Sequence, residues 1–365
     1  CRFGCYQSVF KLVLERLGLD ERVAVWSPGD SDYFRECGPS TAAITLAGVV
    51  TMDLLEAITR PYAPGSAARR AADAIRQRSQ DLLLQRVERE VSRQSPMRRV
   101  FGEVFGGGLF GCLDLLRSAA EELSAYGPPP PRPRVLVTGE IYVRLDPFAN
   151  GFLVHELERQ GLEVLLAPLS EWFEYAATAS LDRGDRSGWR ARVSHQVQLR
   201  ILQRSHDVVH RVLGASLRTP VAAQLRAAAP FVRPQLYGEA VLTVGGPVRE
   251  WRDGEIHGAV NVGPMECMPS RIAASQLSHV REREGLPVLN LSMSGEPLDP
   301  DQLDDFAFDV RRAFLARRGA AAPETTADTA RTRREVAPPA AVTTRLDPAT
   351  AADPSPSGAR TPRIR

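Results

Sequence analysis

The residue with the clearest chemical potential is Cys267, in the segment 263–270 (GPMECMPS). An apolar run before it, residues 259–262, predicts a strand, and the pattern after it, residues 270–284, predicts a helix. A cysteine at a helix N-terminus feels the positive end of the helix dipole and nearby backbone N–H groups, and both favour the thiolate. Thiolate is the form that ligates iron. A buried, inert cysteine in a strand–helix turn is the alternative interpretation.

The other four cysteines have weaker local signals. Cys1 and Cys5 form a Cys-x-x-x-Cys pair, a spacing that can hold a metal or a cluster. Cys37 precedes Gly-Pro and is expected in a loop, whereas Cys112 lies in an apolar helical pattern and is expected in the core. Five scattered cysteines in 365 residues do not suit a disulfide framework. They predict a reducing, cytoplasmic setting.

A second segment of unusual composition, residues 139–150 (GEIYVRLDPFAN), follows another predicted strand. In open parallel α/β sheets, ligands bind past the carboxyl ends of the strands. Both this segment and 263–270 are expected at such ends. The candidate catalytic side chains of the segment are Glu140, Tyr142, Arg144 and Asp146.

Other short motifs carry less weight. His206 and His210 stand at i and i+4 on a predicted helix, a spacing that can bind a metal, but no third ligand is evident. Residues 106–108 are three glycines without the Lys and Ser/Thr of a phosphate-binding P-loop, so ATP binding by that route is not expected. Residues 245–246 lack the third glycine of a dinucleotide fingerprint, and no Gly-x-Ser-x-Gly elbow occurs.

The elements that must position these side chains fall into two parts. Residues 1–127 are predicted to be mostly helical, with a short strand at 23–26. Residues 128–134 (PPPPRPR) predict a stiff linker and a domain boundary. Residues 135–318 predict an α/β domain, and 319–365, rich in Ala, Pro and Arg, predict a disordered tail.

Strand and helix patterns alternate after the linker. Strands are predicted at 135–138, 162–167, 240–244, 259–262 and 287–291, and helices at 149–160, 189–213, 219–229, 270–284 and 302–317. Strand–helix–strand units close right-handed onto a parallel sheet. The predicted fold class is therefore α/β, with doubly wound parallel sheets in Rossmann-like halves, preceded by a mostly helical segment.

Composition and charge limit the kinds of partner that the chain is expected to bind. The chain is 43% hydrophobic, an ordinary value for a globular protein, and its net charge of +2 gives no strong field favouring nucleic acid or a membrane. The arginine-rich tail has no interleaved aromatics for base stacking. There is no signal peptide, and the most apolar stretch, 41–52, is too short to span a bilayer. The first residue is a cysteine, which predicts an N-terminally truncated chain.

Three segments together resemble one protein family. Residues 1–6 (CRFGCY) resemble its Gly-Pro-Cys-Arg-Phe-Gly-Gln-Tyr segment, and 139–150 resemble its Gly-Glu-Ile-Tyr-Val-Arg-x-Asp-Pro-Phe-Ala-Asn segment. Residues 237–245 and 260–269 are similar to its last block. The family is that of the 2-hydroxyacyl-CoA dehydratase and benzoyl-CoA reductase components, including the double-cubane cluster proteins. The resemblance runs from residue 1 to about residue 315.

The resemblance implies an iron–sulfur cluster, of the 4Fe-4S or double-cubane type, that receives low-potential electrons from an ATP-hydrolysing activase. It implies reductive or radical chemistry on an acyl-CoA or another small substrate, either as a dehydratase (a lyase) or as an ATP-coupled reductase component. Cys1 and Cys267 match the family's cysteines and are the expected iron ligands. Cys37 is a further cofactor-binding candidate, and Cys5 stands where the family has glutamine.

Within this interpretation the segment 139–150 would lie near the cluster or the substrate. Glu140 would carry a proton or anchor a polar group, and Arg144 would pair with an anion. The alternative for each candidate is a strand-end salt bridge or a loop hydrogen bond. For the whole chain the alternative is a binding or regulatory α/β module that has lost its cluster. The resemblance leaves pairing as a homodimer or heterodimer open.

Overall fold

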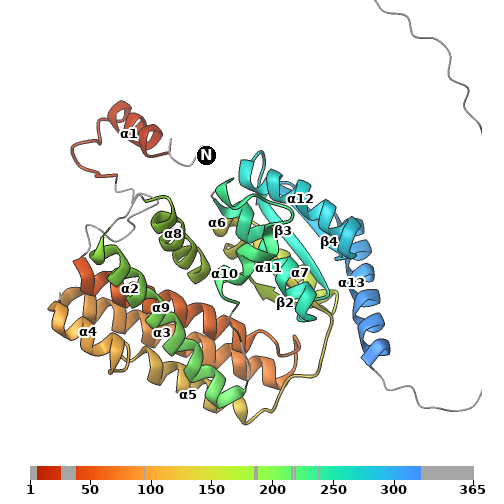
Figure 1. The fold of residues 1–365 in the computed structure, drawn as a ribbon, viewed down its shortest axis with the longest axis horizontal. Coiled ribbons are helices and arrows are strands. Elements are labelled where there is room, and N and C mark those ends of the chain that lie inside the picture. Colours follow the sequence, from red (N-terminus) through yellow and green to blue (C-terminus); the bar gives the residue numbers. More distant parts are fainter. Residues whose placement is uncertain are drawn as a thin grey trace, which may run out of the picture. The chain divides into compact units, whose positions relative to one another are not determined.

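The computed structural model describes residues 6–25, 38–93, 95–184, 188–214, 217, 219–236 and 238–321. Its first part is helical, and its second part alternates helices with four strands (Figure 1). The helices of the first part are α1 (Tyr6–Arg16), α2 (Gly38–Thr59), α3 (Ala67–Arg93), α4 (Met97–Phe105) and α5 (Cys112–Ser124). Residues 23–25 form no strand, and the rest of the predicted strand 23–26 lies outside the described residues.

The second part begins at the end of the proline-rich segment. Its strands are β1 (Arg134–Gly139), β2 (Glu163–Leu166), β3 (Gly258–Pro264) and β4 (Val288–Met293). Its helices are α6 (Ile141–Leu145), α7 (Leu153–Arg159), α8 (Ser170–Asp182), α9 (Trp189–Leu213), α10 (Val221–Ala228), the 3₁₀ helix η2 (Pro234–Leu236), α11 (Glu239–Asp253), α12 (Met268–Glu284) and α13 (Pro300–Ala321).

The helical core is built around α2, whose side chains are apolar on nearly every face. Ile44 and Leu55 are fully buried, and α2 contacts α3, α5 and α9. The helix α9 belongs to the predicted α/β segment by sequence, yet Ile201 and Val209 lie in this helical core. Figure 1 shows α9 running beside α2 and α5. The helical layer is thus completed by a helix that follows the proline-rich segment.

By length and composition, α2 is also apolar enough to cross a membrane, which corrects the expectation that no run in the chain is long enough. The most apolar 18-residue window of this 22-residue helix is 56% buried inside the protein. The helix packs against α3, α4, α5, α8 and α9, and the hydroxyls of Thr51 and Thr59 donate to carbonyl oxygens one turn earlier. Burial on this scale is typical of a core helix.

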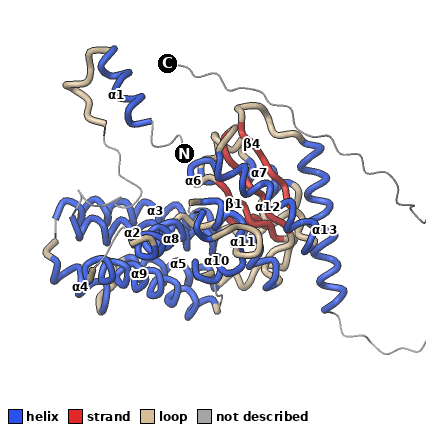
Figure 2. Tube along the Cα trace, turned by 45° about the horizontal axis from the view of Figure 1, so that its top comes forward, coloured by secondary structure: helices blue, strands red, loops and turns tan. Residues whose placement is uncertain are grey.

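The four strands form one parallel sheet in the order β2-β1-β3-β4, which confirms the α/β class (Figure 2). Side chains of β1 alternate between two cores. Leu136 packs with α10, α11 and α12, whereas Val135 and Val137 pack with α7 and α13. Because both faces are covered, the buried positions of β1 from Val135 to Thr138 are apolar or β-branched, as is usual in parallel sheets.

One predicted strand is wrong. Residues 240–244 form the first turns of α11, and every residue from Ala240 to Val248 is buried. A helix that is buried on all sides has no polar face, so its sequence lacks the helical period and is easily mistaken for a strand. Gly245 lies so close to the carbonyl oxygen of Gln224 that a Cβ there would overlap it. The glycine thereby allows α10 and α11 to pack closely.

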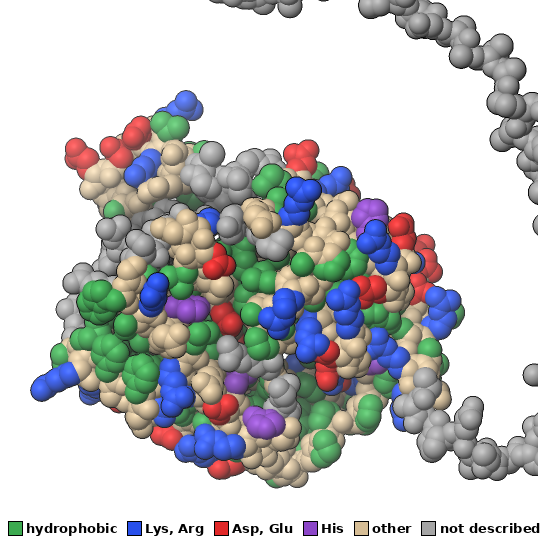
Figure 3. All heavy atoms as spheres, in the orientation of Figure 1, with side chains coloured by type: hydrophobic (Ala, Val, Ile, Leu, Met, Phe, Trp, Pro, Cys, Tyr) green, Lys and Arg blue, Asp and Glu red, His purple; other side chains and the backbone are tan. Residues whose placement is uncertain are grey.

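Charged side chains of both signs are interspersed on the face shown in Figure 3, where no single sign forms a broad field. Ion pairs also join the helical layer to the sheet layer. Arg60 and Arg69 both bind the carboxylate of Glu158 on α7, at 3.3 and 3.1 Å. These side chains are largely shielded from solvent, so the contacts hold α7 against the helices more firmly than surface pairs would.

Candidate functional site

The two segments singled out by sequence lie next to each other at the carboxyl edge of the sheet. Strands β1 and β3 are hydrogen-bonded neighbours, with Gly139 paired to Val262. The chain then turns sharply, and the N–H of Glu140 donates to the carbonyl oxygen of Val262 at 2.8 Å. Gly139 has φ of +115°, and a Cβ at that position would overlap the backbone of Val262. Only glycine fits at this close contact between the two strands.

Two of the predicted catalytic side chains are engaged in local backbone capping. The carboxylate of Glu140 accepts from the N–H of Val143 at 2.8 Å and caps α6. The carboxylate of Asp146 accepts from the N–H of Ala149 at 2.7 Å. The amide of Asn150 donates to the carbonyl of Val143. The segment expected as a loop is therefore a short helix followed by a tied turn, which presents its remaining side chains rigidly.

The other two predicted catalytic residues have opposite surroundings. Tyr142 is 65% exposed on the outer side of α6, and its neighbour Phe148 is 86% exposed. Arg144 is only 3% exposed. Tyr142 of this segment therefore lies at the surface, whereas the charged side chain of Arg144 lies in the interior.

Cys267 stands at the N-terminus of α12, as expected. It is the N-cap residue, with φ of −65° and ψ of 116°, and Pro269 occupies the first turn. Its N–H donates to the carbonyl of Pro264 at 3.0 Å, and the thiol belongs to a half-buried side chain. Glu266 before it has φ of +60°, which turns the chain from β3 into the helix. This position suits a thiolate that binds a group from outside.

The other cysteines divide into one described residue and three that are not. Cys112 is fully buried in the helical core, and burial raises the pKa of its thiol to about 11. The prediction that it belongs to the core is confirmed. Cys1, Cys5 and Cys37 lie outside the described residues. Within the described ranges, no group of three or more His, Cys, Asp or Glu side chains could hold a metal ion.

Arg144 reaches from α6 toward α8, in the interior behind the carboxyl edge. Its guanidinium donates to the carbonyl oxygens of Gly139 (3.2 Å) and Pro168 (3.0 Å) and pairs with Glu171 at 3.4 Å. Its buried Nε has no hydrogen-bond partner. The second carboxylate oxygen of Glu171 accepts from Gln224 at 3.1 Å. In this structure Arg144 makes a salt bridge within the chain, which is the alternative interpretation of this residue.

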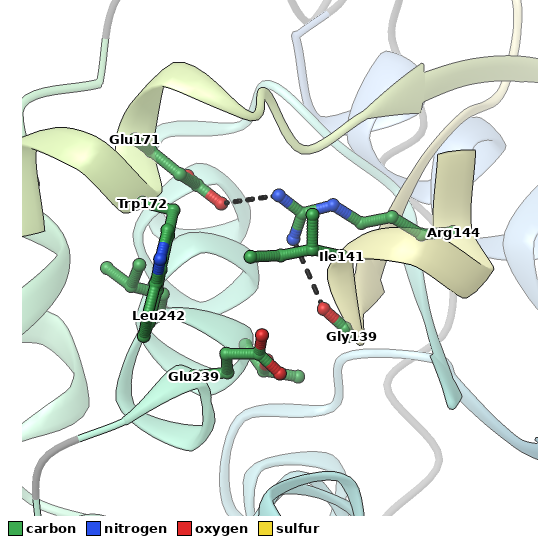
Figure 4. A pocket seen from close by; sticks show the side chains of 8 residues that line it. Gly139, Ile141, Arg144, Glu171, Trp172, Glu239 and Leu242 are labelled. Atoms are coloured by element: carbon green, nitrogen blue, oxygen red, sulfur yellow. Dashed lines mark hydrogen bonds and ion pairs between the residues drawn. The ribbon is translucent and has the colours of Figure 1, made fainter. Parts of the chain in front are cut away.

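A small hollow lies beside this pair. Figure 4 shows Arg144 and Glu171 converging at it, with Trp172 and Leu242 on one side and Glu239 below. Its empty space of about 180 Å³ includes open solvent, and the enclosed part has room for no more than about one water molecule. Its other lining residues are Gly139, Ile141 and Thr243.

The elements around the hollow are held by specific contacts. The carboxylate of Asp53, from α2, accepts from the N–H groups of Leu169 (3.1 Å) and Ser170 (2.8 Å) and so caps α8. The hydroxyl of Tyr175, on α8, accepts from the N–H of Gly238 at 2.8 Å. Gly238 is the N-cap of α11 and makes no side-chain cap, so the first turn of α11 opens toward α8.

Burial governs the electrostatics of this region. It raises the pKa of Glu171, while the neighbouring Arg144 opposes the rise. Burial also raises the pKa of Asp53, and the bonds from Ser170 oppose it. Sequence reasoning missed Glu171 and Trp172, because no motif surrounds them and α8 itself was not predicted. They meet Arg144 only through the fold.

Comparison with protein-family models, with curated proteins and with solved structures finds no match for this chain. The dehydratase resemblance therefore rests on the sequence segments alone, and the function that follows from it is a proposal.

Proposed function

We propose that this chain is the iron–sulfur component of a 2-hydroxyacyl-CoA dehydratase-like system, with Cys267 as one cluster ligand. The observation that carries the proposal is the position of Cys267 at the N-terminus of α12, half-buried and beside the β1 turn that bears the second family-like segment. Cys1 and Cys37 would supply further thiolates, with Cys5 as a third candidate. The cluster would supply low-potential electrons for reduction or radical formation.

The strand order supports the finer fold proposal. From β1 the chain adds β2 on one side, and from β3 it adds β4 on the other, so the order reverses between β1 and β3. Helices cover both faces of the sheet. A doubly wound, Rossmann-like arrangement would place ligands at that reversal, where both singled-out segments leave the sheet. The proposed setting is cytoplasmic, with an ATP-hydrolysing activase as the electron donor and an acyl-CoA or other small molecule as substrate.

The test is iron content under anaerobic purification. The full-length chain should be brown and contain iron and sulfide, and Cys267→Ala should lose most of both. Cys112→Ala is the matched control, because Cys112 is a cysteine of the same chain buried in the helical core. It should keep its iron. A colourless wild-type protein, or equal iron in wild type and Cys267→Ala, would contradict the proposal.

A second candidate is a cluster-free α/β binding or regulatory module. The observation that favours it is the lack of any metal-binding group of three side chains within the described ranges. The same purification separates the two candidates, since the binding module would carry no iron at any Cys267 genotype.

A further inference from the structure

We propose that Asn261 is a positioning residue for Cys267, because its buried amide holds the first turn of α12 against β3 directly after the cysteine. The positioning concerns contacts within the chain alone. The use of the positioned thiol as an iron ligand rests on the proposed function.

Asn261 is the only residue of β3 whose side chain carries a hydrogen-bonding group. It is 1% exposed and lies between Val260 and Val262, which are both fully buried. Burial of an amide is unfavourable unless its N–H and C=O groups are hydrogen-bonded. The partners of Asn261 therefore decide what this polar residue does in an otherwise apolar strand.

The amide of Asn261 joins α12 to β4. Its Nδ2 donates to the carbonyl oxygen of Ser270, in the first turn of α12, at 3.1 Å and to Oδ1 of Asn290 on β4 at 3.0 Å. Its Oδ1 accepts from the hydroxyl of Ser270 at 3.4 Å. Both polar atoms of the amide thus bond the same residue at the start of the helix.

The end of β3 is also packed closely against this turn. A Cβ at Gly263 would lie 2.7 Å from Oγ and 2.8 Å from Cβ of Ser270, so the glycine allows the approach. On the other side of the cysteine, the N–H of Met265 donates to the carbonyl oxygen of Met293 at 2.9 Å. Cys267 therefore lies in a short segment that is tied to the sheet at both of its ends.

A fixed position matters for a thiolate that binds a metal group. Groups that orient a ligand without touching the metal change metal affinity by about 10- to 100-fold. Asn261 would act in this way, through the backbone of Ser270. A comparison residue is Asn150, which is also buried (2% exposed) but bonds residues of its own segment, among them the carbonyl oxygen of Val143 at 3.0 Å.

The first experiment measures hydrogen exchange in the iron-free, full-length protein. Asn261→Val keeps an apolar, β-branched side chain in the strand and removes the amide. The amide N–H of Arg271 donates to the carbonyl oxygen of Cys267 at 2.9 Å and reports on the helix start. Its exchange should become about fivefold faster, as expected when about one net hydrogen bond is lost from a local opening equilibrium. Asn290→Ala, which leaves the bonds to Ser270, should have a smaller effect.

Further variants make the exchange result specific. Asn150→Ala is the matched control and should leave exchange at Arg271 unchanged. Gly263→Ala should displace the helix start and accelerate that exchange, and the added change Ser270→Gly, which removes both overlapping atoms, should reverse the effect. Asn261→Ala, which adds no bulk, serves if the valine variant does not fold.

The second experiment concerns the cluster in the anaerobically purified, iron-containing protein. Asn261→Val keeps Cys267 but should lose iron to a chelator about tenfold faster than wild type. The electron paramagnetic resonance spectrum of the reduced protein should also change, whereas Asn150→Ala should match wild type in both measurements. A general loss of stability would leave the spectrum of the remaining folded protein unaltered, so the spectrum identifies a displaced ligand.

Three results would overturn parts of the proposal. Unchanged exchange at Arg271 in folded Asn261→Val or Asn261→Ala would refute the positioning, as would faster exchange of equal size throughout the chain. Faster exchange at Arg271 with unchanged iron loss and an unchanged spectrum would refute the role toward the cluster. If Cys267→Ala keeps its iron, the proposed function is wrong, and exchange in the iron-free protein still decides whether Asn261 positions the start of α12.

Discussion

The two edges of the sheet use their charged groups differently. At the carboxyl edge, β1 ends in Gly139 against the backbone of Val262 on β3, and Arg144 turns inward beside a hollow with its Nε unpaired. Cys267 lies half-buried at the adjacent helix start. Backbone crowding, an unpaired donor and open space occur together at this edge.

The amino edge is closed by paired charges and ring contacts. Arg134 binds Glu163 at 2.8 Å, and its N–H donates to Nδ1 of His257 at 3.1 Å. The ring of His257 meets that of Phe314 edge-on, with centroids 5.0 Å apart. Burial lowers the pKa of His257 to about 4, so this histidine stays neutral and acts as an acceptor.

The difference between the two edges shows that a shifted pKa does not by itself identify a functional site. Glu250 is near the amino end of the sheet, one turn before the end of α11, and burial raises its pKa to about 8. Glu171 is shifted in the same direction. Only Glu171 lines a hollow, together with a cation. The combination of burial, an opposite charge and an adjacent hollow is therefore the more useful criterion.

The sharpest test of the carboxyl edge is Gly139→Ala. The new Cβ would overlap the backbone of Val262, and φ of +115° disfavours any side chain. We expect a loss of about 4 kcal/mol or more in the free energy of unfolding, measured by urea denaturation.

Gly285→Ala is the matched control, since Gly285 also has positive φ (+74°) but has no atom within 4 Å of its Cβ position. It should lose only about 1–2 kcal/mol. Equal losses of unfolding free energy in the two variants would mean that the contact between Gly139 of β1 and the backbone of Val262 on β3 is not close.

A smaller effect is expected for Arg144→Gln, at about 3 kcal/mol near neutral pH. The change leaves buried Glu171 without its cation and removes two bonds to carbonyl oxygens. The loss should shrink in acid, where Glu171 is protonated. Arg252→Gln, which breaks a more exposed pair with Glu284, should cost about 1 kcal/mol or less. The measurement is chemical denaturation of both variants at two pH values. Equal losses of unfolding free energy in the two variants would contradict the expected difference between the buried and the exposed ion pair.

The amino edge is tested by Glu250→Gln. The folded-state pKa of Glu250 is raised from 4.5 to about 8, so its contribution to stability is present below about pH 4.5 and is lost as pH rises through about 8. Above that pH the glutamine variant should be more stable than wild type by about 2 kcal/mol, measured as the difference in unfolding free energy. Glu122→Gln, at an exposed carboxylate of α5 that pairs with Arg78, should leave the pH profile unchanged. A wild-type stability that does not fall between about pH 4.5 and about pH 8 would contradict the assignment.

Much of the sheet could be predicted because its strands carry their own signal. The apolar runs around Val135, Val164, Val260 and Leu289 were all expected as strands, and their parallel pairing is observed. The helical start at Cys267 was expected from Pro269 and is observed. The strand predicted at 240–244 was wrong, because total burial removed the polar positions that reveal a helix.

The sequence by itself determined the parallel α/β class and the position of segments 139–150 and 263–270 at the carboxyl ends of strands, because consecutive β-branched runs joined by helices leave few alternatives. It also indicated that Arg144 would pair with an anionic group. Only the tertiary structure decided which group that is. Glu171 lies 27 residues away, on a helix that is capped by Asp53 from a different layer, and no local pattern links the three. Contacts between distant segments depend on packing, which local propensity does not encode.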